Sequence, residues 1–102
     1  MRLPKERCPT HPGVYIKEDL LEEMEFTQQQ LADRLFVSRR TINQIVNFKR
    51  SITPEMALRL GMLTGTSPEM WVNLQSAYDL WTARQNMEPS DIKKIKPIIL
   101  EG

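Results

Sequence analysis

Residues 27–47 read TQQQLADRLFVSRRTINQIVN, and this stretch decides the fold of the chain. It predicts one helix capped by Thr27 and a second helix capped by Ser38, joined by a tight turn. Gln30 stands three residues after Thr27, which is the spacing of a capping box. Apolar residues recur at helical spacing in both halves, so each helix has one buried side, formed by Leu31, Ala32, Leu35, Ile42, Ile45 and Val46.

The second of these helices leaves one polar face exposed. Arginine can bond bidentately to guanine in the DNA major groove and glutamine to adenine, and each such pair gives about 1–3 kcal/mol of discrimination. Two arginines also stand in the first turn, where a free helix would favour acids. The face could be an ordinary solvated surface, but this chemistry favours DNA binding. Its members are Arg39, Arg40, Asn43, Gln44 and Asn47.

The net charge of +1 hides two oppositely charged regions. Residues 17–26 hold Lys17 against Glu18, Asp19, Glu22, Glu23 and Glu25. Residues 34–59 hold a single acid, Glu55, so the second region is a candidate footprint for nucleic acid. The basic residues of that region are Arg34, Arg39, Arg40, Lys49, Arg50 and Arg59.

Length and composition indicate one small globular domain. The chain has 102 residues, of which 40% are hydrophobic and 26% charged. Cys8 is the only cysteine, so no internal disulfide forms, and no cysteine or histidine set suggests a metal. His11 is the only histidine, and we expect a turn or helix-entry residue there, because a lone histidine is no catalytic site. We therefore expect a cytoplasmic protein that is not an enzyme, has no cofactor and has no membrane segment.

The remaining chain predicts three more helices. Residues 1–12 are rich in proline, so we expect an extended N-terminal arm there, and we expect residues 13–24 to form a helix with Ile16, Leu20, Leu21 and Met24 facing inward. Thr53-Pro54-Glu55 and Ser67-Pro68-Glu69 both combine a cap, a proline and an acid, so two further helices begin there. The prediction is an all-α fold of five helices, with one domain over residues 13–84 and a C-terminal tail over residues 85–102.

The last predicted helix carries both tryptophans of the chain. Burial in the core is the first interpretation for Trp71 and Leu74. Tyr78 and Trp81 lie further along the helix, where amphipathic aromatics often anchor an interface. We predict that this C-terminal helix forms the seam of a homodimer through Tyr78 and Trp81, with Leu74 assigned to the same seam. Such a dimer would place two recognition helices about 34 Å apart on a palindromic site.

At this point the chain resembles a known family. The helix-turn-helix residues are similar to those of the Cro and phage-repressor class. A longer resemblance, over residues 11–84, is to the HigA-type antitoxins, also called VapI-like. It rests on HPG at 11–13, the segment 27–47, the K-R-x-I-T run at 49–53, the A-L-R-L run at 57–60 and GTSPEMWVNLQSAYDLW at 65–81.

The resemblance implies a dimer that binds operator DNA, represses its own operon and neutralises a RelE-like ribonuclease toxin that cleaves mRNA. It implies that base edges face Arg39, Arg40 and Gln44. It also implies that the DNA backbone is held by residues that set affinity rather than specificity. That second set comprises Gln28, Thr41, Asn43, Asn47, Lys49 and Arg50.

Two departures from the family pattern bear on geometry. Phe36 stands where the turn often has glycine, and because a non-glycine residue with positive φ is strained, we expect a slightly different turn. Phe48 also replaces a frequent glycine, and we expect it to pack on the helix that begins at Pro54 or to touch DNA sugar.

Other functions stay open at the level of sequence. The runner-up is a stand-alone repressor of a phage or mobile element without a toxin. A protein-interaction module that has lost DNA binding is a third possibility, against which the intact arginine face argues. The acidic residues of helix 13–24 form either a solvated face or a docking surface for a basic toxin.

Overall fold

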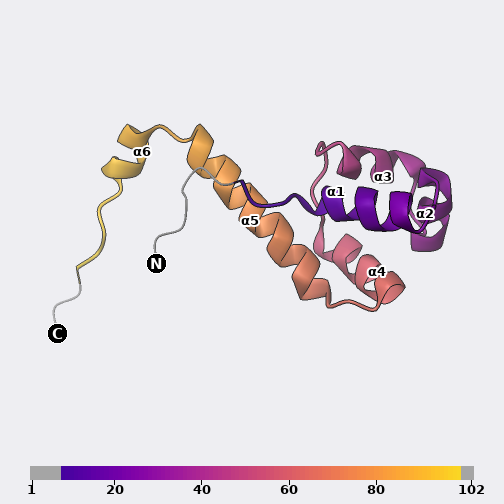
Figure 1. The fold of residues 1–102 in the computed structure, drawn as a ribbon. Coiled ribbons are helices and arrows are strands. Elements are labelled where there is room, and N and C mark those ends of the chain that lie inside the picture. Colours follow the sequence, from indigo (N-terminus) through magenta and orange to yellow (C-terminus); the bar gives the residue numbers. More distant parts are fainter. Residues whose placement is uncertain (1–7, 100–102) are drawn as a thin grey trace.

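The computed structural model describes residues 8–99, and every regular element among them is helical (Figure 1). The predicted all-α class is confirmed. A first helix, α1, passes into a π-helical segment, η1, and the next two helices form the helix-turn-helix. The elements are α1 (Pro12–Tyr15), η1 (Ile16–Glu23), α2 (Gln28–Leu35), α3 (Arg39–Val46), α4 (Pro54–Thr64), α5 (Pro68–Asn86) and α6 (Pro89–Lys94).

The capping signals of the helix-turn-helix form as predicted. Thr27 Oγ1 accepts from the backbone N–H of Gln30, whose Oε1 accepts in return from the backbone N–H of Thr27, both at 3.0 Å. Ser38 Oγ accepts from the N–H of Thr41 at 3.1 Å and so caps α3. These bonds satisfy donors that a helix otherwise leaves without partners, so they fix where both helices begin.

The core lies where the first helix, the helix-turn-helix and α4 meet. The predicted inward residues of α2 and α3 are buried there, apart from Val46, which is half-buried. Ile16 and Leu20 of η1 are also buried, but Met24 is 59% exposed, so its predicted inward position is wrong. The reason is the wider π-helical turn, in which the N–H of Met24 bonds to the carbonyl of Asp19 five residues back. The sequence carries no signal for this departure from an α-helix.

The C-terminal part corrects the predicted helix count. α5 extends to Asn86, and α6 is an additional short helix within the segment predicted as a tail. Pro89 ends the pattern of α5 but suits the first turn of a new helix, since its missing N–H would have no partner there. Asp91 in the first turn and Lys93 and Lys94 in the last turn complement the dipole of α6.

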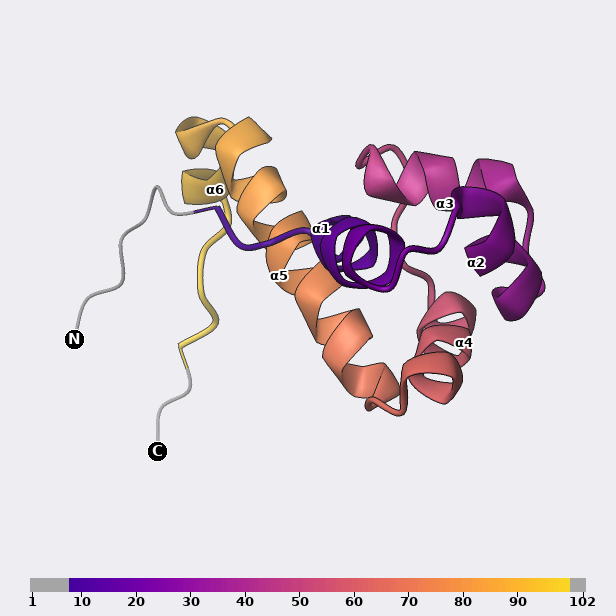
Figure 2. The same ribbon diagram turned by 45° about the vertical axis from the view of Figure 1, so that its right-hand side comes forward.

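The molecule is elongated, with extents of 55 × 28 × 28 Å. α1, α2, α3 and α4 form one body, and α5 starts against α4 and extends away from that body (Figures 1 and 2). α6 has no buried residue. Among residues 8–99, no helix is both long and apolar enough to cross a membrane.

The turn between α2 and α3 keeps a left-handed residue although it is not glycine. Phe36 has φ 57° and ψ 44°, and the N–H of Val37 bonds to the carbonyl of Ala32 at 3.0 Å, which closes the end of α2. The expectation of a different turn at Phe36 is therefore wrong: hydrogen bonds at the helix end hold the strained conformation. The side chain is 85% exposed and contributes little packing in return.

We expect Phe36→Gly to stabilise the chain by about 1 kcal/mol, because glycine adopts positive φ without steric cost. The midpoint of thermal unfolding should rise by about 4–8 °C for that gain. Phe48→Gly is the matched control, since Phe48 also has φ 62° but stacks on His11. A Phe36→Gly variant with an unchanged or lower melting temperature would contradict the strain assigned to this turn.

His11 is the N-cap of α1, which confirms its prediction as a turn or helix-entry residue. Its side chain is buried. Its Nδ1 accepts from the N–H of Gly13 at 2.9 Å. The ring stacks on Phe48 with centroids 4.5 Å apart and meets the ring of Tyr78 edge-on at 4.7 Å. Burial lowers the pKa of His11 from its ordinary value, and the charge of Asp79 opposes this shift in part.

The lowered pKa of His11 predicts a stability that depends on pH. The unfolded chain binds a proton more readily than the folded chain, so the free energy of unfolding is highest above the ordinary pKa of 6.5 and falls as pH drops through the folded value. Urea unfolding at pH 7.5 and pH 5.5 should reveal this loss. His11→Asn keeps a capping acceptor without a titrating ring, so the loss should shrink; an identical loss in the variant would show that His11 is not its cause.

Candidate nucleic-acid interface

The first turn of α3 presents two free guanidinium groups. Arg39 and Arg40 directly follow the Ser38 cap and are both exposed. Neither takes part in an ion pair or side-chain hydrogen bond within residues 8–99. Two adjacent cations at a helix start oppose the helix dipole, so an anion or acceptor bound there would stabilise this arrangement.

Gln28 and Asn43 connect the two helices of the motif. Gln28 is the first residue of α2, and its Oε1 accepts from Nδ2 of Asn43 in the middle of α3 at 3.3 Å. The contact is exposed, so both amides keep free donors and acceptors on the surface. Both residues were predicted to contact the DNA backbone, and the structure brings them together beside Arg39 and Arg40 on α3.

The loop after α3 is held to the helix by two further contacts. Gln44 Oε1 accepts from Nε of Arg50 at 2.8 Å, and the carbonyl of Gln44 accepts from the N–H of Lys49 at 2.8 Å. Asn47 caps the end of α3 and donates from Nδ2 to the carbonyl of Asn43 at 2.8 Å. Lys49 and Arg50 therefore stay exposed beside the same helix that carries Gln44.

The nine residues predicted to contact DNA thus lie at the start of α2, along α3 and in the loop that follows it. Thr41 is half-buried, as are Gln28 and Gln44, and its hydroxyl shares a hydrogen bond with that of Ser38 at 2.9 Å. It therefore supports the cap of α3. The surface can donate to phosphates from its rim and to base edges from its centre.

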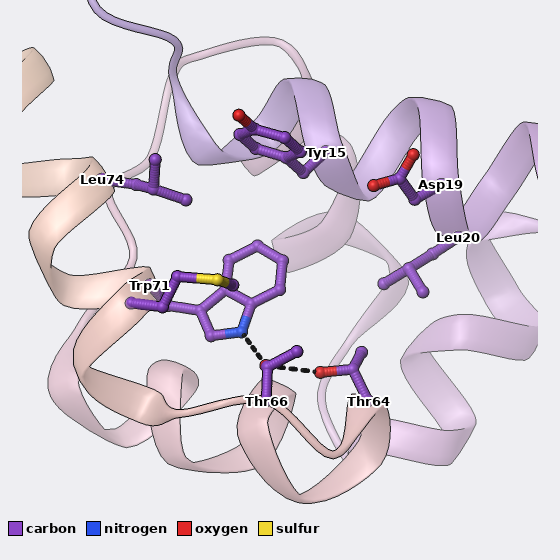
Figure 3. A pocket seen from close by; sticks show the side chains of 8 residues that line it. Tyr15, Asp19, Leu20, Thr64, Thr66, Trp71 and Leu74 are labelled. Atoms are coloured by element: carbon purple, nitrogen blue, oxygen red, sulfur yellow. Dashed lines mark hydrogen bonds between the residues drawn. The ribbon is translucent and has the colours of Figure 1, made fainter.

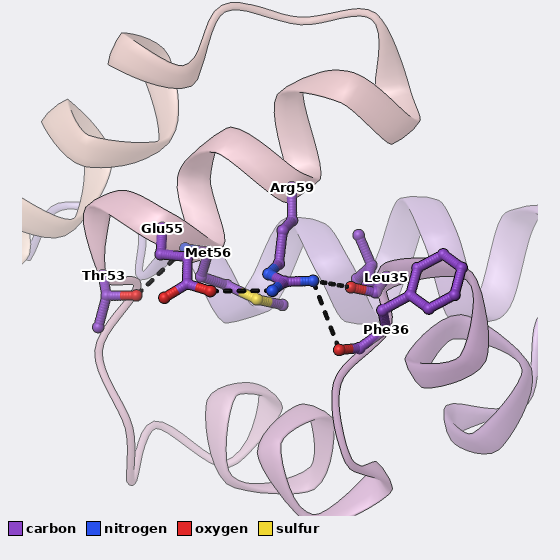
Figure 4. Close-up of polar contacts among 6 residues, drawn as sticks. All are labelled: Leu35, Phe36, Thr53, Glu55, Met56 and Arg59. Carbon is purple, nitrogen blue, oxygen red and sulfur yellow. Dashed lines mark hydrogen bonds and ion pairs between the residues drawn. The ribbon is translucent and has the colours of Figure 1, made fainter.

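Arg59 does not belong to this basic surface, although its charge was expected to contribute there. Its guanidinium donates from Nη1 to the carbonyls of Leu35 and Phe36 at 2.8 and 3.4 Å, and from Nη2 to Glu55 at 2.8 Å (Figure 4). It satisfies carbonyls that the end of α2 leaves open. The only acid of residues 34–59, Glu55, is paired with Arg59 in the same contact, and neither ion pair found among residues 8–99 involves a cation of α3.

Two positioning contacts were not predicted from the sequence. Phe48 stacks on His11, and this stack ties the loop after α3 to the start of α1. Gln75 of α5 is buried, and its Oε1 accepts from the N–H of Ile52 at 2.8 Å, while its Nε2 donates to Asp79 at 2.8 Å. A polar residue four positions after Trp71, on the apolar side of a helix, was the available signal.

The three residues predicted for the dimer seam lie on α5. Leu74 and Trp81 are half-buried, and Nε1 of Trp81 is enclosed without a hydrogen-bond partner among the described residues. Tyr78 is half-buried against His11 of its own chain. Part of the Tyr78 surface is therefore engaged inside the protomer before any partner binds.

The helix-turn-helix family matches residues 16–71, which include α2, α3 and α4. The antitoxin HigA-1 of Vibrio cholerae is 35% identical to this chain, and the similarity covers 98% of this chain and 92% of the relative. The chain belongs to the HigA-type helix-turn-helix family. An uncharacterised helix-turn-helix transcriptional regulator of Escherichia coli, YbaQ, is 36% identical over 83% of this chain and 75% of the relative.

A solved member of the HigA-type family shares the fold. The antitoxin HigA of Pseudomonas aeruginosa, solved with the higBA promoter, is 38% identical and superposes with a TM-score of 0.82. The similarity covers 89% of this chain and 99% of that chain. The resemblance noted from the sequence is therefore confirmed at the level of family and fold.

Proposed function

We propose that this chain is an antitoxin that binds operator DNA as a homodimer, represses its own operon and neutralises a RelE-like mRNA-cleaving toxin. One observation carries the DNA-binding part: Arg39 and Arg40 are exposed in the first turn of α3 and have no acidic partner within residues 8–99. The Pseudomonas aeruginosa HigA structure supports it, because that protein was solved with promoter DNA.

The proposed contacts divide into two classes. Arg39, Arg40 and Gln44 reach base edges in the major groove and select the operator sequence. The backbone set adds affinity that falls with rising salt, because each phosphate contact releases counterions. That set comprises Gln28, Thr41, Asn43, Asn47, Lys49 and Arg50.

The proposed dimer follows from the position of α5. Its second half extends beyond the body of the protomer, where Leu80 is 52% exposed and Trp81 is half-buried. Two copies joined through Leu74, Tyr78 and Trp81 would bury this apolar surface. They would also present two α3 helices to consecutive major grooves of a palindromic operator.

We expect Trp81→Asp to weaken the dimer at least about tenfold, because a buried indole at a seam is replaced by a charge. Sedimentation equilibrium across a protein dilution series measures the change. Trp81→Phe is the matched control and should stay close to wild type. A Trp81→Asp dimer as tight as the wild-type dimer would remove Trp81 from the seam.

The toxin part of the proposal is tested by growth. The small reading frame beside this gene is expressed with and without this protein. Arrest by the neighbour alone and recovery with this chain would support the antitoxin. Direct binding of the purified pair, measured by calorimetry, separates neutralisation of the toxin from repression of its synthesis.

A second function is favoured by the regulator from Escherichia coli, whose name carries no toxin. In that case this chain is a stand-alone repressor of a phage or mobile element. A harmless neighbouring reading frame, together with sequence-specific binding upstream of the gene, would select this alternative.

A further inference from the structure

A cavity of about 470 Å³ opens on the side of the molecule formed by the first helix and the start of α5 (Figure 3). None of the residues predicted to contact DNA lines it. The indole N–H of Trp71 donates to Thr66 Oγ1 at 2.9 Å, so its polar atom is satisfied and mainly carbon faces the cavity. The other walls include Tyr15, Leu20, Met70 and Leu74, with Asp19 at the edge.

The C-terminal segment exposes apolar side chains that could fill an apolar cavity. Ile95, Ile98 and Ile99 are 72%, 87% and 85% exposed, so three large apolar side chains lie in solvent. Lysines stand beside them at positions 93, 94 and 96. A segment of this composition gains free energy by burying its isoleucines while its lysines remain near acidic groups.

The acidic surface of η1 adjoins the cavity through Asp19. Glu18, Asp19, Glu22 and Glu23 of η1 are exposed, and none of them forms an ion pair within residues 8–99. Asp19 itself lines the cavity. An occupant that combines apolar side chains with positive charge therefore fits both the walls and the rim.

The geometry of α5 indicates whether the C-terminal segment that fills the cavity comes from the same chain or from the second copy of the dimer. Met70, Leu74, Ala77 and Trp81 follow the i, i+4, i+7, i+11 spacing, so they share one flank of the helix, and Leu74 belongs to both the cavity and the proposed seam. Two helices that pair about a two-fold axis perpendicular to them run antiparallel. Pairing centred between Leu74 and Trp81 places Asn86 of one copy beside Met70 of the other, so the chain leaves α5 at its partner's cavity.

We propose that residues 95–99 of each copy pack into this cavity of the second copy, so that the dimer is closed by two exchanged C-terminal segments. The inference rests on the homodimer of the proposed function and adds the contact that completes it. It explains why α6 and the segment after it lack a buried surface in the single chain.

The test uses cysteines in a Cys8→Ser background. One tagged copy carries Met70→Cys, and a co-expressed copy with a different tag carries Ile98→Cys. A short bismaleimide should join the two copies, as detected by mass spectrometry of the doubly purified dimer. Met62→Cys is the matched control for Met70→Cys, because Met62 is 88% exposed on α4 and outside the cavity, and it should give little product.

Each outcome has one meaning. A dimer without cross-linking between positions 70 and 98 overturns the exchange and leaves the dimer standing. In a second sample, one chain carries both cysteines; cross-linking only within that chain overturns the exchange and indicates that the C-terminal segment folds back on its own chain. A monomer by light scattering removes the dimer itself, which is a failure of the proposed function.

A second measurement avoids cross-linking. Ile98→Glu with Ile99→Glu should raise the dimer dissociation constant about tenfold or more, whereas Ile98→Leu with Ile99→Leu should leave it within about twofold. Operator binding per dimer at saturating protein should be equal for both pairs of substitutions. An unchanged dissociation constant in the glutamate pair would show that the isoleucines are not buried in the dimer.

Discussion

Replacing Arg39 and Arg40 together with alanine is expected to lower operator affinity by about 30-fold to about 10⁴-fold for each half-site. This range combines two bidentate base contacts at about 1–3 kcal/mol each. Neither arginine has a partner within residues 8–99, so no structural contact is lost with them. Fluorescence anisotropy with labelled operator, beside a scrambled duplex of the same length, measures the change in specificity.

The control for the double substitution of Arg39 and Arg40 has to remove two positive charges from a surface outside the predicted DNA contacts. Lys17→Ala with Arg84→Ala does so on η1 and α5, and it should weaken binding only slightly. Lys49→Ala should weaken operator and scrambled duplex alike and reduce the salt slope by about one. An Arg39→Ala, Arg40→Ala variant that keeps its preference for the operator would refute the assignment of these arginines to bases.

The result for Arg39 and Arg40 depends on positions that the sequence could predict. The caps at Thr27 and Ser38 and the apolar spacing fix both helices locally, so the exposed face of α3 follows from residues close in the chain. These signals have a physical cause within one or two turns, and the structure confirms the caps and the all-α class.

Features that depend on long-range contacts were not predictable in the same way. Arg59 counts as a surface cation in the sequence, yet it binds carbonyls of α2 more than twenty residues away. Phe48 finds its partner in His11, also distant in the chain. The π-helical course of η1 and the additional helix α6 depend on hydrogen bonds and end effects that apolar periodicity does not report.

Gly13 shows how the fold places the recognition helix. A Cβ at this position would lie 2.3 Å from the carbonyl oxygen of Ile45 and 3.0 Å from Nδ1 of His11. The first atom belongs to the backbone of α3, so no side-chain rotation relieves the clash, and α1 would have to move away from α3. Only glycine allows this close approach, which explains its place in the HPG sequence at 11–13.

We therefore expect Gly13→Ala to destabilise the chain by at least about 2 kcal/mol. A steric cost of about 3 kcal/mol or more exceeds the gain of about 1 kcal/mol that alanine brings to a helix. The melting temperature should fall by about 8–16 °C. Urea unfolding followed by circular dichroism measures the loss.

Gly65→Ala is the comparison for Gly13→Ala, because Gly65 has φ 70° but no atom within 4 Å of the place that a Cβ would occupy. That variant carries only backbone strain and should lose about 1 kcal/mol. Operator binding should separate the two further: Gly13→Ala displaces the helix that carries the arginines, whereas Gly65→Ala leaves α3 in place. Equal losses of stability and equal operator affinity in both variants would mean that the contact between α1 and α3 does not position the recognition helix.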